Sequence, residues 1–252
     1  MKLRNLLIGT GLVALLSNCG SIIPRAGEED LLEYRKTELA NAPQAVSCLK
    51  EGEYIIPDGV LDVYARMVDK RETTFWSGGP AAGTIDYNRL RGQEAEFFSK
   101  VEEKGYSKKE SQIFYTILST PDNIFFKQSK SGKADFPEAV LHERVHKEFG
   151  WLKSEDQMKV YQVLEKLEKR TPPTGHNLFL DDKPKYRGFV RMHVNSNWQE
   201  FFPYLAQGAL EDYVEVALKT EFPEVYDLFL EVKEKSVVEC GNERTQLPTN
   251  FP

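Results

Sequence analysis

Two histidines separated by three residues form the most informative part of the sequence. The run is His142-Glu143-Arg144-Val145-His146, a His-Glu-x-x-His (HExxH) pattern within a stretch that predicts a helix. Residues four apart lie one turn apart on the same face of a helix, so both imidazoles can bind one metal ion. The glutamate stands beside them, where a general base for activating water is needed. The motif therefore predicts a zinc-dependent hydrolase, with a peptidase as the first choice.

A catalytic zinc site has three protein ligands and an open position for water, so the motif leaves one ligand to be found. A histidine six residues after His146 would indicate the metzincin arrangement, but Leu152 occupies that position. The other common solution is a glutamate from a later helix. Glu211, at the start of the run 211–215, is the best candidate, and Glu200 is the alternative third ligand.

The two motifs together resemble those of the gluzincin metallopeptidases, in particular the branch that includes anthrax-lethal-factor-like domains. The second motif is Glu211-Asp212-Tyr213-Val214-Glu215. The resemblance covers the two short motifs and the segment between them, and it does not extend to the N-terminal half. It implies a zincin-like metallopeptidase domain with zinc as its cofactor. The implied roles are zinc ligands for His142, His146 and Glu211, and catalytic base for Glu143.

Peptide hydrolysis passes through a tetrahedral oxyanion, which needs a hydrogen-bond donor besides the metal. The candidate donors are His176, Arg191, His193, Tyr204 and Tyr213. Zinc-bound imidazoles also donate their second N–H to a carboxylate or a carbonyl group. Asp212 and Glu215 are the candidate partners for that contact, and the sequence does not choose between them.

Residues 1–19 resemble the signal peptide of a bacterial lipoprotein. Lys2 and Arg4 precede an apolar stretch that is too short to cross a bilayer as a permanent helix. The stretch ends in a lipobox-like sequence, in which cleavage precedes Cys19 and that thiol receives a lipid; Asn18 departs from the small residue usual before the cysteine. We expect an exported, lipid-anchored protein of the cell envelope. An ordinary cleaved signal or an uncleaved anchor is the alternative.

The two remaining cysteines, Cys48 and Cys240, form an even pair. An exported chain enters an oxidising compartment, so a disulfide between them is expected, with two separate buried thiols as the alternative. Such a bridge would close a loop of nearly the whole domain. In the chain-entropy description it would stabilise the fold by roughly 4–5 kcal/mol.

Composition limits the remaining possibilities. The chain has 252 residues, 40% hydrophobic and 29% charged, which is typical of a globular protein. A net charge of −6 without a Lys/Arg cluster argues against nucleic-acid binding. The Gly-rich run 78–83 lacks the lysine of a phosphate-binding loop, so no nucleotide site is expected. A peptide or protein substrate, and the membrane through the lipid anchor, are the expected partners.

Apolar periodicity and turn signals predict an α+β fold that is mostly helical, with a small sheet beside the HExxH helix. Residues 20–50 are expected to form a tether and the start of the domain. Residues 51–252 are expected to form the catalytic domain, with a helical N-terminal part (51–120) and a metal-site part (121–252). The expected helices lie near 31–39, 58–68, 87–104, 107–118, 136–150, 154–170, 198–218 and 221–237, and a strand is expected at 123–127.

Two other functions fit the same residues. A lipoprotein binding module with a structural or degenerate zinc site would use the metal without hydrolysis, and a closed four-ligand site would indicate it. A zinc hydrolase of a non-peptide substrate is also compatible, because the HExxH motif indicates water activation and leaves the substrate open.

Overall fold

The structure of the protein is a computed structural model, and it describes residues 25–41, 47–68, 82–84, 90–168, 198–210, 212–240 and 243–244. Most of these residues are helical and a few form short strands, so the predicted mostly helical α+β class is confirmed. The predicted signal peptide and its Cys19 lie outside the described residues. None of the described helices has both the length and the apolar character needed to cross a membrane.

A three-stranded sheet occupies the centre of the N-terminal half. Its strands are β1 (Glu53–Ile56), β2 (Ala82–Thr84) and β3 (Ile124–Lys127), arranged in the order β1-β3-β2. β1 runs parallel to β3, and β2 runs antiparallel to it along one edge of the sheet. The strand predicted at 123–127 is therefore confirmed as β3, and it lies in the middle of the sheet.

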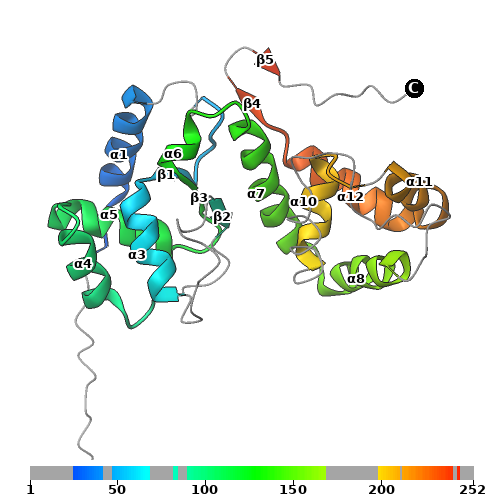
Figure 1. Ribbon diagram of the computed structural model, residues 1–252, viewed down its shortest axis with the longest axis horizontal. Coiled ribbons are helices and arrows are strands. Elements are labelled where there is room, and N and C mark those ends of the chain that lie inside the picture. Colours follow the sequence, from blue (N-terminus) through cyan, green and yellow to red (C-terminus); the bar gives the residue numbers. More distant parts are fainter. Residues whose placement is uncertain are drawn as a thin grey trace, which may run out of the picture.

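Among the described residues, four helices pack with this sheet around one apolar core, on one side of the molecule (Figure 1). They are α1 (Glu28–Asn41), α3 (Asp58–Val68), α4 (Glu94–Glu102) and α5 (Lys108–Ser119). The start of α5 follows from a capping box: the Ser107 side chain accepts from the Glu110 N–H, and the Glu110 carboxylate accepts from the Ser107 N–H. The helix predicted at 87–104 begins only at Glu94, because Leu90 to Gly92 form a turn.

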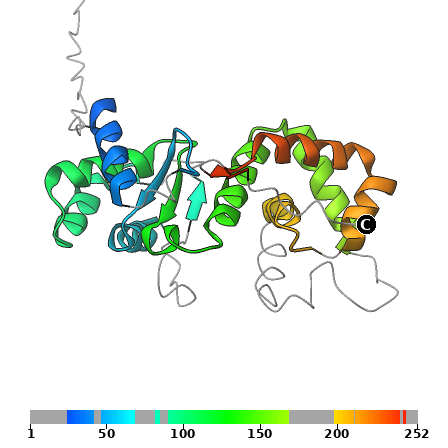
Figure 2. The ribbon, with the colours of Figure 1, turned by 90° about the horizontal axis from the view of Figure 1, so that it is seen from above.

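The C-terminal half is built around α7 (Phe136–Gly150), the helix that carries the HExxH motif. α7 lies between the two halves, against β2 on one side and against α10 and α12 on the other (Figures 1 and 2). The short helix α6 (Gln128–Ser131) follows β3 and lies beside the sheet. The other elements of the C-terminal half are α8 (Ser154–Glu168), η1 (Trp198–Glu200), α10 (Phe201–Ala206), α11 (Asp212–Glu221), α12 (Pro223–Lys235), β4 (Glu239–Cys240) and β5 (Glu243–Arg244). The central helix thus contacts both parts of the fold.

The single helix predicted at 198–218 is broken into three elements: η1, α10 and α11. The break lies at Gln207 and Gly208, where Gly208 has a φ of 63°. A residue with that left-handed conformation ends a helix, and glycine adopts it without steric cost. The prediction of one continuous helix was wrong because this glycine ends α10.

α8 packs one face against the C-terminal core. Met158 is 48% exposed, whereas Val160, Val163 and Leu167 are buried. Gln157, in the first turn of α8, donates its side-chain amide to carbonyl oxygens at the end of α7 and just beyond it. This contact satisfies carbonyl groups that a helix end leaves without an intrahelical partner.

Candidate metal centre

The histidines of the HExxH motif project from one face of α7 toward α10. His142 and His146 have ring centroids 4.8 Å apart, and their Nε2 atoms lie 3.2 Å from each other. The helix is fixed by apolar side chains that are buried in the C-terminal core, among them Val140, Val145 and Phe149. Burial of these side chains leaves the two imidazoles facing the next element.

Glu200, the last residue of η1, completes a group of three. Its Oε2 lies 3.1 Å from Nε2 of His142 and 3.1 Å from Nε2 of His146. Ligand atoms bound tetrahedrally to zinc at about 2.0–2.1 Å lie roughly 3.3 Å from one another. The observed spacings of 3.1 to 3.2 Å are close to that value. Two imidazole nitrogens and one carboxylate oxygen therefore lie close enough together to bind one metal ion.

The electrostatics of the group also suit a cation. Burial raises the pKa of Glu200, but hydrogen bonds and positive charge from the two histidines outweigh it and hold that pKa well below its ordinary value. Burial lowers the pKa of His142, but its contacts with Glu200, Glu143 and Gln207 outweigh this and raise the pKa above its ordinary value. The site therefore stabilises positive charge, which a proton or a metal ion can supply, and metal binding displaces the proton.

Gln207 fixes the second nitrogen of His142. Its Oε1 lies 3.1 Å from Nδ1 of His142, and its Nε2 donates to the backbone carbonyl of Glu138 at 3.1 Å. Because the amide nitrogen of Gln207 donates to the Glu138 carbonyl, its amide oxygen faces the imidazole of His142 and accepts from Nδ1–H. That tautomer leaves the lone pair of Nε2 directed toward the metal position.

Tyr204 packs edge-on against the ring of His142, with ring centroids 5.0 Å apart and the side chain only 4% exposed. Glu200, Tyr204 and Gln207 are spaced by four and three residues, and all three contact His142. Gln207 was not among the predicted site residues, although polar side chains at i, i+4 and i+7 within an apolar run are a recognisable signal of one helix face. The role of Tyr204 as an oxyanion donor stays a prediction.

The remaining predicted site residues have different positions. Glu143 is on α7 next to His142 and is 9% exposed. Glu211, His176, Arg191 and His193 lie outside the described residues. Asp212 is exposed at the start of α11, and Tyr213 packs against the C-terminal core. Glu215 pairs with Lys219 at 2.9 Å and accepts from Tyr226 at 3.2 Å. The contact expected from Asp212 or Glu215 to a ligand histidine is made by Gln207.

Comparison of this chain with protein-family models, with curated proteins and with solved structures finds no match. The resemblance to gluzincins therefore stays a prediction that depends on two short motifs.

Proposed function

We propose that this protein is a zinc-dependent metallopeptidase with a zincin-like catalytic domain, and that His142, His146 and Glu200 bind the zinc. The observation that carries the proposal is the convergence of three ligand atoms, with 3.1 to 3.2 Å between neighbours, beside the glutamate of an HExxH motif. When bound, zinc would polarise the substrate carbonyl and lower the pKa of water toward 7.

Glu143 is the general base of the proposed reaction. Its carboxylate accepts the proton of the attacking water and then passes that proton to the leaving amine. Its position directly after His142 and its 9% exposure keep it close to the metal position and largely shielded from bulk water. The proposed oxyanion donors remain His176, His193 and Tyr204.

The arrangement of the sheet favours a peptide as the substrate. β2 forms one edge of the sheet, and it lies against the helix that carries the histidines (Figure 2). The backbone groups along a sheet edge can pair with an extended peptide, which a small non-peptide substrate cannot do. This placement supports a peptidase over other zinc hydrolases.

The location of the protein is part of the same proposal. The lipobox-like sequence around Cys19 supports export and a lipid anchor at the cell envelope. The disulfide between Cys48 and Cys240 supports an oxidising compartment. The active site would then act on peptides or proteins outside the cytoplasm.

Zinc content tests the ligand set. The purified full chain should contain one zinc ion, which Glu200→Ala should lose and Glu211→Ala should keep. Zinc lost only in Glu211→Ala would instead identify that residue as the third ligand. A folded wild-type chain that neither contains zinc nor can be loaded with it would contradict the metallopeptidase and favour the lipoprotein binding module.

Glu143→Gln tests the reaction. The glutamine side chain retains the shape of glutamate but cannot accept a proton, so hydrolysis of a peptide library should fall by about 10²–10⁴-fold while zinc content stays unchanged. Glu155→Gln, an exposed position on α8, serves as the control and should keep wild-type activity. Full hydrolytic activity in Glu143→Gln would contradict the assigned role.

A further inference from the structure

Arg144, in the middle of the HExxH motif, is one of the most buried charged residues of the described structure, at 4% exposed. It stands two residues after His142 and two before His146. At about 100° of rotation per residue, its side chain leaves α7 roughly opposite the two imidazoles. The same helix therefore presents metal ligands on one face and a buried guanidinium on the other.

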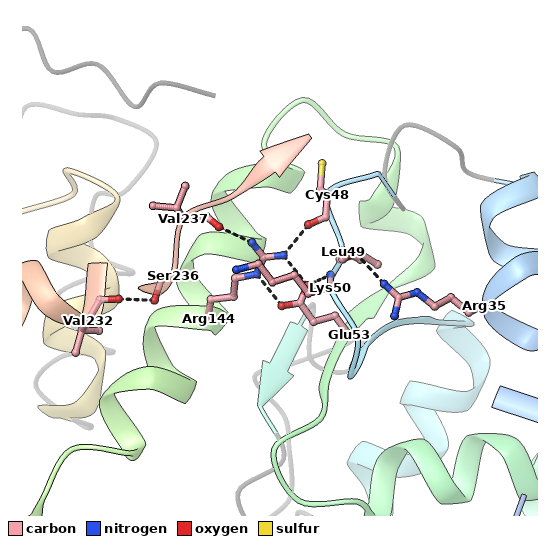
Figure 3. A network of polar contacts seen from close by, with 9 residues as sticks. All are labelled: Arg35, Cys48, Leu49, Lys50, Glu53, Arg144, Val232, Ser236 and Val237. Atoms are coloured by element: carbon pink, nitrogen blue, oxygen red, sulfur yellow. Dashed lines mark hydrogen bonds and ion pairs between the residues drawn. The ribbon is translucent and has the colours of Figure 1, made fainter. Parts of the chain in front are cut away.

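Four hydrogen bonds hold the Arg144 guanidinium (Figure 3). It donates to both carboxylate oxygens of Glu53, at 2.7 and 2.8 Å, and to the backbone carbonyls of Cys48 and Val237, each at 2.7 Å. The Glu53 carboxylate is itself 4% exposed and also accepts from the Lys50 N–H at 2.8 Å. Such a planar, bidentate contact fixes orientation as well as distance.

The partners of Arg144 come from distant parts of the chain that the disulfide joins. Cys48 precedes β1, Glu53 begins it, Val237 lies just before β4, and Cys48 is bonded to Cys240 across a sequence separation of 192. The bridge therefore holds two of the accepting carbonyls near each other, on the face of α7 that points away from the metal position. We call Glu53, Arg144 and the Cys48–Cys240 disulfide the helix clamp.

The clamp restricts motions of α7 that apolar packing leaves possible. Contacts of Val140, Val145 and Phe149 with the core are non-directional, so they define the rotation of the helix less sharply than hydrogen bonds do. The same rotation would break the bidentate contact between Arg144 and Glu53, and it would displace both imidazoles from Glu200. Metal ligands require positions within fractions of an ångström, so the clamp acts on the metal site through the helix.

The disulfide is also placed where a small reductant can reach it. Cys48 and Cys240 both line a cavity of about 1100 Å³, and Cys240 is partly exposed. Reduction by a dithiol transfers two electrons and two protons to the Sγ–Sγ bond, which leaves two thiols and oxidises the dithiol to its own disulfide. The carbonyl groups of Cys48 and Val237 would then no longer be held together by a covalent link.

We propose that Arg144 is a positioning residue of the metal centre and that the Cys48–Cys240 disulfide keeps it in place, so that tight metal binding requires the oxidised clamp. This inference rests on the proposed function, since it concerns the site formed by His142, His146 and Glu200. It adds a dependence on redox state that the ligands themselves do not have.

The test compares zinc affinity, by competition with a chromogenic chelator, in full-length variants that remain folded by circular dichroism. Cys48→Ser/Cys240→Ser opens the bridge, and Glu53→Leu/Arg144→Met removes the ion pair without leaving one charge buried alone. Both should bind zinc about 10–100-fold more weakly than the wild type. Wild-type protein reduced with a dithiol, then freed of it, should match the double serine variant.

Two controls separate positioning from general destabilisation. Arg35→Met removes the hydrogen bond to the Leu49 carbonyl, next to Cys48, without touching α7, and should keep wild-type affinity (Figure 3). Val101→Ala destabilises the N-terminal core, where Val101 is fully buried. This variant should also keep wild-type zinc affinity. With Co²⁺ in place of zinc, the d–d absorption should change in the clamp variants and stay unchanged in both controls.

The outcomes are distinguishable. Weakened affinity and altered Co²⁺ spectra confined to the clamp variants support the proposal. Wild-type zinc affinity in the folded double serine variant and in the reduced protein would overturn this proposal but not the proposed function. A loss of zinc affinity in Val101→Ala equal to that in the clamp variants would have the same meaning. If the Glu53/Arg144 variant does not fold, the double serine variant and the reduced protein decide. A folded wild type without a metal site overturns both proposals.

Discussion

At the scale of single residues, the chemistry depends on how the two nitrogens of His142 are used. Nε2 faces Glu200 and His146, while Nδ1 donates to the Gln207 amide oxygen. A hydrogen bond at Nδ1 fixes the tautomer and the orientation of the ring. Gln207 contributes to the metal centre although it is not a metal ligand.

Replacing Gln207 by leucine should therefore weaken metal binding. The expected loss in zinc affinity is about 10–100-fold, because Nδ1 of His142 would lose its acceptor and the ring its fixed orientation. Chelator competition measures the affinity, and Gln199→Ala, an exposed neighbour in η1, serves as the control. Equal affinities for the two variants would show that Gln207 does not orient His142.

At the scale of elements, the metal centre depends on the position at which α10 ends. Glu200, Tyr204 and Gln207 share one face toward α7, and the chain turns away at Gly208. A helix that continued past Gly208 would extend along α7 and would not turn toward α11. The glycine thus determines where the ligand-bearing element stops.

Gly208→Ala should lower stability through the backbone alone. The φ of 63° disfavours any residue with a Cβ by about 1 kcal/mol, and no atom lies within 4 Å of the Cβ that alanine would add. The melting temperature should fall by about 2–4 °C for a chain of this size. Gly59→Ala in α3, which is equally open but has an ordinary φ, should not lower it. Equal melting temperatures for the Gly208 variant and the wild type would contradict this account.

At the scale of the whole molecule, the disulfide connects the start of the described domain with its end. Loss of a cross-link between residues separated by 192 positions should reduce the free energy of unfolding by about 5 kcal/mol in the chain-entropy description. Disulfides often stabilise proteins by less than this description gives, so the expected loss of unfolding free energy is about 2–5 kcal/mol. Urea denaturation of Cys48→Ser/Cys240→Ser beside the wild type measures it, and an unchanged midpoint would contradict the prediction.

The stability of the molecule should also depend on pH through Glu38 of α1. Burial raises the pKa of this carboxyl to about 7 from 4.5, against the effects of hydrogen bonds from Tyr34 and Ile55 and of the charge on Arg35. As the pH rises from about 4.5 to 7, the unfolded chain loses this proton before the folded protein does, so folding stability falls over that range and stays lower above it.

Glu38→Gln isolates this effect, because glutamine does not titrate. The variant should be more stable than the wild type at about pH 8, by on the order of 1–3 kcal/mol, and close to it at about pH 4.5. Denaturant melts of both proteins at the two pH values measure the difference. A difference that does not change with pH would contradict a raised pKa at Glu38.

The sequence by itself determined the features that depend on near neighbours along the chain. The two histidines of the HExxH motif share a face because helix periodicity is local, and α5 begins where Ser107 and Glu110 cap it. β3 follows from a short aromatic run between turns. Each of these results from hydrogen bonds and side-chain spacing within a few residues.

Only the tertiary structure decided which distant residues meet these elements. Glu200 reaches His146 from 54 positions away, and Glu53 reaches Arg144 from 91. Arg144 resembles an exposed charge in the sequence, yet it is buried and fully engaged in the fold. Burial of apolar surface is non-directional, so it does not by itself choose which distant residues meet. Those contacts are determined by the close packing of the whole core, when every element is in place.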